Sequence, residues 1–115
     1  VNVTSIWGPM ARGARATYAA SKAALDGLTG TLAAEVAPFN ILANCVAPGY
    51  TETELIKAIY DAARLDALAK TVPMKRLAKP AEIAAVVAWL AGPENGYVTG
   101  QSIVIDGGLS RLREV

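Results

Sequence analysis

A tyrosine and a lysine four residues apart, Tyr18 and Lys22, are the side chains in this sequence best suited to proton transfer. They lie in the stretch TYAASK, which reads as part of a helix, and residues four apart share one helix face with Cβ atoms about 5–6 Å apart. A phenol has an ordinary pKa of about 10, too high for proton exchange at neutral pH, and a fixed ammonium group nearby favours the phenolate. The spacing therefore suits an acid paired with the cation that tunes it.

The same spacing also occurs by chance in amphipathic helices, so ordinary helix patterning stays open. Ser5 favours the chemical interpretation because it stands at the end of a predicted strand, thirteen residues before Tyr18. A loop between them can bring the serine hydroxyl beside the phenol. A carbonyl oxygen held by two hydroxyl groups, one of them acidic, is arranged to accept a hydride at carbon and a proton at oxygen.

The elements that must hold these side chains alternate between strands and helices. Apolar runs bounded by turn residues predict strands at residues 1–5, 41–47 and 102–106. Helical periodicity predicts helices at residues 17–36 and 53–69, and a third that opens at Pro80 and stops before Gly92. The order strand, helix, strand, helix, helix, strand predicts an α/β fold with a parallel sheet and right-handed crossovers.

The predicted helices carry apolar faces that the fold must cover. The helix at residues 17–36 has a leucine and valine stripe and a second stripe of small residues, which predicts that two of its faces are buried. The other two helices each have one apolar face. The residues predicted to point inward are Leu55, Ile56, Ile59, Ala62 and Ala63 in the second helix, and Ile83, Val86, Val87 and Leu90 in the third.

The composition argues against several kinds of site. Hydrophobic residues make up 53% of the chain and charged residues 18%, which suits one α/β domain with a buried core. The formal net charge is +1, so no basic face points to nucleic acid or anionic lipid. One cysteine and no histidine exclude a disulfide framework and argue against a metal site. No apolar run reaches membrane-spanning length, and a reducing cytoplasm fits best.

Some polar residues near the predicted site have structural interpretations. We expect Cys45 to pack inertly in a buried strand and Asn44 to satisfy buried backbone groups. Asp106, with two glycines after it, is interpreted as a turn after the last strand. Trp7 and Tyr50 flank the predicted pocket, where substrate contact and simple packing remain equal alternatives.

The sequence begins at Val1, already inside a predicted core strand that needs paired neighbours on both sides. We therefore expect the chain to be a fragment, a processed form, or one part of a split protein.

Four segments, in their order and spacing, carry a resemblance to a known family. They are Ser5, the stretch from Tyr18 to Lys22, the stretch from Asn44 to Gly49 together with Thr53, and Val98 to Gln101 leading into Asp106-Gly107-Gly108. In these segments the chain resembles the C-terminal half of a short-chain dehydrogenase/reductase, of the 3-oxoacyl-(acyl-carrier-protein) reductase type. The resemblance covers essentially the whole chain.

The resemblance implies the C-terminal part of a Rossmann-like doubly wound sheet, with residues 1–115 as a single partial domain. The N-terminal half of the family fold, which carries the glycine-rich dinucleotide turn, is absent from this sequence. The segment at about residues 50–77 corresponds to the family's substrate lid.

The resemblance also assigns roles to residues. Tyr18 corresponds to the general acid/base, Lys22 to its tuning cation and a ribose contact, and Ser5 to the group that orients the substrate carbonyl. The cofactor-binding residues that it implies are Tyr18, Lys22, Pro48, Gly49, Thr51 and Thr53, with no metal.

The resemblance thus implies an oxidoreductase that uses NAD or NADP, with NADP favoured, on a small carbonyl or alcohol substrate. A homo-oligomer, dimer or tetramer, is expected, and neither nucleic acid nor membrane as a partner. The alternative is a non-catalytic fragment that serves only as a folding or assembly module with a partner.

Overall fold

The core of the molecule is a sheet of three parallel strands. A computed structural model describes residues 1–111, with strands β1 (Asn2–Val3), β2 (Cys45–Pro48) and β3 (Ser102–Ile105) in the spatial order β1-β2-β3. In the register, Cys45 of β2 lies between Asn2 of β1 and Ser102 of β3. The predicted parallel α/β fold and its order of strands and helices are confirmed.

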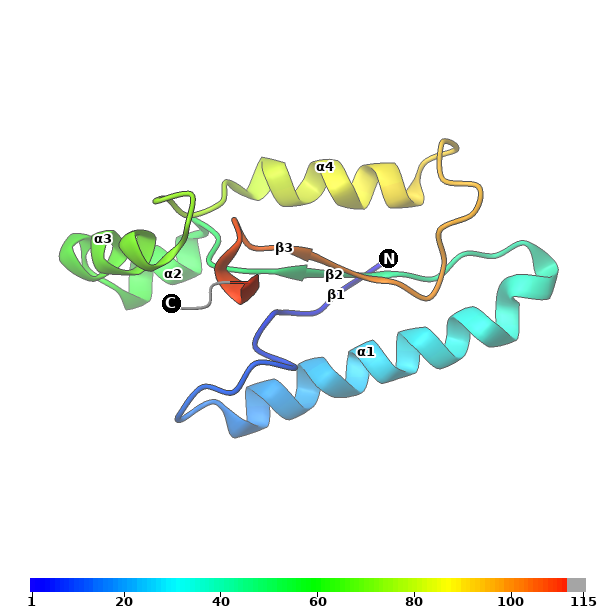
Figure 1. The fold of residues 1–115 in the computed structure, drawn as a ribbon, viewed down its shortest axis with the longest axis horizontal. Helices are drawn as coiled ribbons and strands as arrows, with labels where there is room; N and C mark the ends of the chain where they lie inside the picture. Colours follow the sequence, from blue (N-terminus) through cyan, green and yellow to red (C-terminus); the bar gives the residue numbers. More distant parts are fainter. Residues whose placement is uncertain (112–115) are drawn as a thin grey trace.

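Helices cover both faces of this sheet (Figure 1). Helix α1 (Ala16–Val36) lies on one face and α4 (Pro80–Ala91) on the other, whereas α2 (Glu54–Ile59) and α3 (Ala62–Thr71) lie beyond the end of the sheet where the strands finish. Two 3₁₀ turns complete the described elements, η1 (Ala37–Phe39) and η2 (Leu109–Arg111). Crossover helices on the two faces are what joins parallel strands in doubly wound folds.

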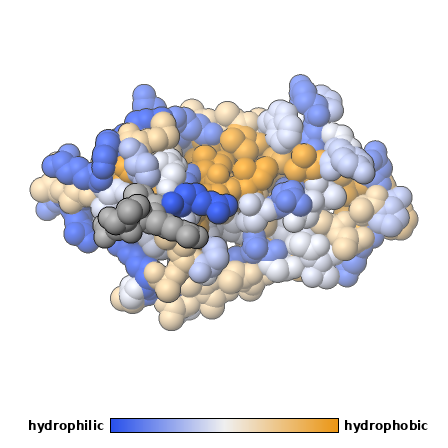
Figure 2. Space-filling view, in the orientation of Figure 1, coloured by the Kyte–Doolittle hydropathy of each residue, from blue (hydrophilic) through white to orange (hydrophobic). Residues whose placement is uncertain are grey.

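The predicted inner face of α4 forms the main apolar core. Val46 of β2 packs with Ile83 and Leu90 of α4, and all three side chains are buried. The partly buried neighbours of this cluster are Ala78, Val86, Val87, Val98, Ile103 and Ile105. Figure 2 shows apolar side chains gathered over the region of α4 and β3 on one face of the molecule.

Helix α1 is less covered than its two stripes predict. Only Thr29 and Ala33 of this helix are buried, while Leu28 is 62% and Leu32 39% exposed. The residues of the small stripe are also exposed in this chain, namely Ala20, Ala24, Gly27, Thr31 and Ala34. The prediction of two buried faces is therefore wrong for the 111 described residues, because the sheet beneath α1 has only three strands to cover it.

The predicted lid, at about residues 50–77, folds as two helices, so the prediction of one helix at residues 53–69 is wrong. Tyr60 is extended, with φ −121° and ψ 134°, and Asp61 begins a new helix by accepting a hydrogen bond from the Arg64 backbone N–H at 2.7 Å. An aspartate N-cap of this kind favours a helix start over continuation.

The apolar anchors of the lid also differ from the prediction. Leu55 and Ile59 of α2 are 70% and 58% exposed, whereas Leu68 and Val72, in and just after α3, are almost fully buried. Val72 is held by the turn after β3, where a Cβ on Gly107 would lie 2.8 Å from the Val72 Cγ1. The lid is therefore fixed to the turn after β3 through α3 and the residue that follows it, Val72.

Strand β2 begins later than the apolar run at residues 41–47 predicts. The Ala43 N–H donates to the Thr99 hydroxyl at 3.0 Å, and the Ala43 carbonyl accepts from the Gly100 N–H at 2.7 Å. Ala43 thus pairs with the loop before β3, whereas Asn44 already pairs with β1 by accepting the Asn2 N–H at 2.9 Å. Among residues 1–111, none of the helices is both long and apolar enough to cross a membrane.

Candidate active site

The structure brings every residue predicted for the site to the wall of one cavity. This open cavity of about 600 Å³ lies at the carboxyl ends of the strands, where parallel α/β sheets bind ligands. The predicted residues that line it are Ser5, Tyr18, Lys22, Pro48, Gly49, Thr51 and Thr53. The wall on the side of α4 is apolar and was not predicted as part of the site; it includes Ile83, Ala84, Val87 and Ala88.

Tyr18 and Lys22 lie on one face of α1, as their spacing predicts. The Lys22 Nζ is 5.7 Å from the centre of the Tyr18 ring and donates a hydrogen bond to the Val3 carbonyl at 2.9 Å. The Tyr18 side chain is 38% exposed and faces the cavity. The ammonium group is thus held between the end of β1 and the phenol, with further N–H donors free to meet a ligand.

Ser5 lies just beyond β1 and is buried, with 5% of its surface exposed. Its Oγ accepts a hydrogen bond from the Trp7 N–H at 3.2 Å, which leaves the hydroxyl proton available to a ligand. Gly8 lets this loop approach α1, since a Cβ at Gly8 would lie 3.3 Å from the Ala23 nitrogen. The sequence between Ser5 and Tyr18 therefore folds back so that both side chains reach the same cavity.

The loop after β2 forms the third wall. The Gly49 N–H donates to the Ile105 carbonyl at 2.9 Å, and the Thr51 hydroxyl donates to the Gly49 carbonyl at 3.3 Å. Thr53 caps α2 by accepting the Ile56 N–H at 3.2 Å. The loop is thus rigid at both ends and presents threonine hydroxyls to the cavity.

The charged side chain in the lining of the cavity is positive. Among residues 1–111, its lining includes one ammonium group, four hydroxyl side chains besides the phenol, and no carboxylate. Hydroxyl and ammonium donors suit a ligand rich in hydroxyl, amide or phosphate groups.

A second open cavity of about 250 Å³ adjoins the first and shares Tyr18, Gly49, Thr51 and Thr53 with it. It extends toward the lid and is also lined by Trp7, Arg12, Arg15, Tyr50, Leu55, Ile56, Ile59 and Tyr60. Trp7 and Tyr50 pack at 5.7 Å between ring centres, as one of the two alternatives predicts, and both also line this cavity. Arg12 and Arg15 were missed, since arginines in a glycine-containing loop read as solvent-exposed.

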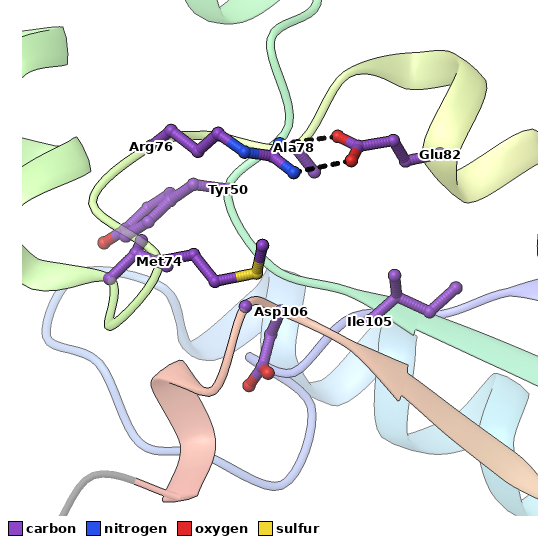
Figure 3. A pocket seen from close by; sticks show the side chains of 9 residues that line it. Tyr50, Met74, Arg76, Ala78, Glu82, Ile105 and Asp106 are labelled. Atoms are coloured by element: carbon purple, nitrogen blue, oxygen red, sulfur yellow. Dashed lines mark hydrogen bonds and ion pairs between the residues drawn. The ribbon is translucent and has the colours of Figure 1, made fainter.

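A small pocket of about 90 Å³ lies between the lid, the start of α4 and the end of β3 (Figure 3). The Arg76 guanidinium donates to both carboxylate oxygens of Glu82 at 2.7 Å, and Glu82 also accepts the Lys79 N–H at 2.7 Å. The hydrogen bonds from Arg76 and Lys79 lower the pKa of Glu82 to about 2. This ion pair fixes the start of α4, which is a structural role.

The turn after β3 closes the same pocket. Asp106 accepts the Gly108 N–H at 2.9 Å and the Ser110 N–H at 2.6 Å. Burial opposes ionisation of Asp106, but these hydrogen bonds outweigh it and leave the pKa of the carboxyl below its usual value. The interpretation of this segment as a structural turn is confirmed.

Two buried residues near the strands also behave as predicted. The Asn44 side chain donates to the Val98 carbonyl at 2.7 Å and accepts the Gln101 N–H at 3.0 Å, so it satisfies backbone groups. Cys45 is 1% exposed, and burial raises the pKa of its thiol. A buried thiol of this kind is a packing residue rather than a nucleophile.

The fold and the cavity define the class of protein. Three parallel strands between helices, with the cavity at their carboxyl ends, form part of a Rossmann-like fold. The family model described as enoyl-(acyl carrier protein) reductase matches residues 1–110.

Curated relatives agree with this match. The chain is 45% identical over 109 residues to the 3-oxoacyl-(acyl-carrier-protein) reductase FabG of Vibrio cholerae, covering 95% of this chain and 44% of that protein. It is 47% identical over 109 residues to the FabG of Thermotoga maritima, with the same coverage of 95% and 44%. It is also 40% identical to an acetoacetyl-CoA reductase of Allochromatium vinosum, again covering 95% and 44%.

Solved structures show the same fold. A 4-hydroxyisoleucine dehydrogenase mutant in complex with NADH and succinate matches with a TM-score of 0.91 and 33% identity, covering 98% of this chain and 47% of that one. ElxO with NADP bound matches with a TM-score of 0.89 and 32% identity, covering 96% and 46%. The chain belongs to the short-chain dehydrogenase/reductase family, and it spans a little under half the length of these relatives.

Proposed function

We propose that this chain is the catalytic part of an NAD(P)-dependent oxidoreductase that interconverts a small carbonyl compound and its alcohol. The observation that carries the proposal is that Ser5, just beyond β1, and Tyr18 and Lys22 of α1 line one cavity at the carboxyl edge of the sheet. The names of the curated relatives, which are reductases of 3-oxoacyl and acetoacetyl thioesters, support the same class of reaction.

In this proposal the chain's own residues move and hold the proton. The hydroxyl groups of Ser5 and Tyr18 bind the carbonyl oxygen, and the Tyr18 hydroxyl gives that oxygen its proton as the alcohol forms. The Lys22 ammonium, 5.7 Å from the Tyr18 ring, stabilises the phenolate left behind by an attraction of about 3 kcal/mol at an effective dielectric of about 20. The apolar wall from α4 faces the same open cavity.

The cavity fits the nicotinamide end of NAD or NADP. The donors along its wall suit ribose hydroxyls and a carboxamide, and the residues that would hold this end are Tyr18, Lys22, Pro48, Gly49, Thr51 and Thr53. When bound, the nicotinamide supplies the hydride. Solved relatives with NADP and with NADH support either dinucleotide, and NADP is our first choice.

We also propose that the protein is a homo-oligomer. Leu28 of α1 and Trp89 of α4 are 62% and 44% exposed, and an apolar side chain on a helix surface is stabilised when a second copy covers it. The alternative function, a non-catalytic folding or assembly module, keeps the fold and the apolar surfaces but predicts no reduction of any carbonyl compound.

The test uses the complete gene product that carries these residues. We expect NAD(P)H oxidation with a panel containing acetoacetyl-CoA, acetoacetate and 4-hydroxy-2-butanone. Tyr18→Phe should lower kcat by about 10²–10⁴-fold, since it removes the proton donor, while leaving dinucleotide affinity nearly unchanged. Tyr97→Phe is the control, because Tyr97 is 97% exposed and does not line the cavity.

Two results would count against the proposal. Retention of most activity by Tyr18→Phe would mean that Tyr18 and Lys22 are only helix patterning. Absence of any NAD(P)H oxidation by the wild-type protein across the panel would favour the assembly module instead.

A further inference from the structure

The second cavity contains a cationic cluster beside the proposed acid. Arg12 lies in the loop after β1, and Arg15 lies directly before α1. Both line the cavity of about 250 Å³ that reaches Tyr18, and neither belongs to the segments that carry the family resemblance. Nothing in the proposed proton transfer uses these guanidinium groups.

Aromatic rings hold the Arg12 guanidinium in place. Its central carbon is 5.2 Å from the centre of the Trp7 ring and 5.8 Å from that of Tyr50, and its Nη1 donates to the Tyr50 hydroxyl at 3.1 Å. A guanidinium over aromatic faces keeps its charge and its edge donors while its position is fixed. Arg12 is therefore oriented before any ligand arrives.

The Arg15 guanidinium is nearest to the proposed acid. Its central carbon is 6.0 Å from the centre of the Tyr18 ring, and its Nη2 donates to the Tyr60 hydroxyl at 3.3 Å. A group that binds Arg15 thus lies within a few bond lengths of a carbonyl that binds Tyr18.

The positive charge of this cluster has no counter-ion in the cavity. Within residues 1–111 the carboxylates that form ion pairs do so with Lys57, Lys70 and Arg76, and no aspartate or glutamate lines the second cavity. The partners of both arginines are phenols, which are neutral acceptors and take up one of the five N–H donors of each guanidinium. The remaining donors are arranged for an anion.

We infer that Arg12 and Arg15 bind an anionic group of the substrate, a carboxylate or a phosphate, close to the carbonyl that reacts at Tyr18. The inference rests on the proposed function and narrows its substrate class to short, negatively charged carbonyl compounds. The spacing supports this, because the Arg15 central carbon is 6.0 Å from the centre of the Tyr18 ring, which places the anionic group a few bonds from the carbonyl. Guanidinium groups are the side chains best matched to carboxylate and phosphate oxygens.

A purely structural role is the rival explanation. Tyr50 and Tyr60 belong to the lid segment, so the two hydrogen bonds could serve only to hold the lid against the loop after β1. That role predicts equal losses for charged and neutral substrates, whereas anion binding predicts a larger loss for the charged ones. Tyr50→Phe and Tyr60→Phe remove the two hydrogen bonds but keep both charges.

The experiment compares matched substrate pairs in the complete gene product. Acetoacetate is paired with the neutral 4-hydroxy-2-butanone, and dihydroxyacetone phosphate with dihydroxyacetone, so that the pairs distinguish a carboxylate from a phosphate. Arg12→Gln and Arg15→Gln should each lower kcat/KM for the preferred charged substrate by about 10- to 100-fold, the range for a lost hydrogen bond to a charged group. With Arg12→Gln the neutral partner should change less than about threefold, within the scatter expected for an untouched contact. Arg15→Gln also removes a cation whose central carbon is 6.0 Å from the Tyr18 ring centre, so it should lower kcat/KM for the neutral substrate too, and for the charged one by a further factor of about 10 to 100.

Controls and a second readout complete the test. Arg64→Gln removes a charge from an exposed helix surface outside the cavity and should change neither substrate. Saturation-transfer NMR of acetoacetate and of dihydroxyacetone phosphate reports binding without turnover. The preferred anion should give a signal with the wild type and lose it in the Arg12→Gln, Arg15→Gln double variant.

The outcomes separate this inference from the proposed function. Turnover of neutral and charged substrates with equal efficiency, or equal losses for both in the arginine variants, would overturn the inference while leaving the oxidoreductase intact. If no carbonyl compound reacts, the proposed function fails, and the NMR signal alone then decides whether the arginines bind an anion.

Discussion

Gly49 is the position where a single methyl group should do the most damage to the site. It follows β2, and a Cβ at this residue would lie 2.8 Å from the Asp106 Cβ and 2.9 Å from the Asp106 Cα. Carbon atoms in favourable contact are about 3.5–4.0 Å apart, so Gly49→Ala forces the ends of β2 and β3 apart. Neither end moves easily, because the Gly49 N–H is bonded to the Ile105 carbonyl and the Asp106 carboxylate to the turn that follows.

The magnitude follows from this overlap. Overpacking a rigid contact costs about 1–3 kcal/mol of folding stability. For a domain of this size, each kcal/mol corresponds to a change of roughly 4 °C in Tm, which predicts a loss of about 4–12 °C. Since Gly49 also lines the main cavity, Gly49→Ala should lower dinucleotide affinity as well as Tm.

A second glycine gives the matched control. Gly30 lies in α1, and a Cβ there would meet nothing within 4 Å. Gly30→Ala should therefore raise Tm, because alanine stabilises a helix interior by up to about 1 kcal/mol over glycine. Thermal unfolding and dinucleotide titration of the two variants measure the difference. A Gly49→Ala protein as stable as the wild type would refute the reasoning, since it would mean that the two strand ends separate without cost.

Two further predictions concern the ion pair behind the lid and the exposed face of α1. Because Glu82 has a pKa of about 2 when folded and an ordinary value near 4.5, its contribution to stability is complete above pH 4.5 and is lost as the pH falls toward about 2. Glu82→Gln should thus lower Tm at pH 7 but not at about pH 2, where the Glu82 pairing is itself being lost. The control, Glu35→Gln, should change Tm little at either pH. A difference in Tm between Glu82→Gln and the wild type that does not depend on pH would contradict the assignment. Gly27→Leu should leave the chain folded, since a Cβ at Gly27 meets nothing within 4 Å, but should shift the sedimentation coefficient toward that of a monomer. Gly96→Leu, equally open, should leave sedimentation unchanged, and an unchanged oligomer in the Gly27 variant would argue against association through α1.

Local patterns in the sequence were enough to predict some elements. The inner face of α4 was predictable because apolar residues three and four apart lie on one side of a helix. Ile83 and Leu90 on that side are buried, as predicted. The placement of Tyr18 and Lys22 on one face of α1 follows from helix geometry alone.

Other features depend on contacts that a pattern does not contain. The break at Tyr60 had a visible signal, since Asp61 is a good N-cap residue, but its effect competes with an apolar periodicity that runs through it. The burial of Val72 depends on the Gly107 turn, and the late start of β2 depends on Thr99, both distant in sequence. The arginine cluster needed the loop after β1 and the lid to be seen side by side.

The division of the lid into α2 and α3 has a consequence for its motion. Helix α3 is anchored by Leu68 and Val72, whereas the six residues of α2 have no buried side chain and are too few to form a stable helix without support. The free energy of local unfolding is therefore lowest in α2, which borders the arginine-containing cavity. We expect a ligand of this cavity to enter as this one short helix unfolds, with Tyr60 as the joint and α3 still in place.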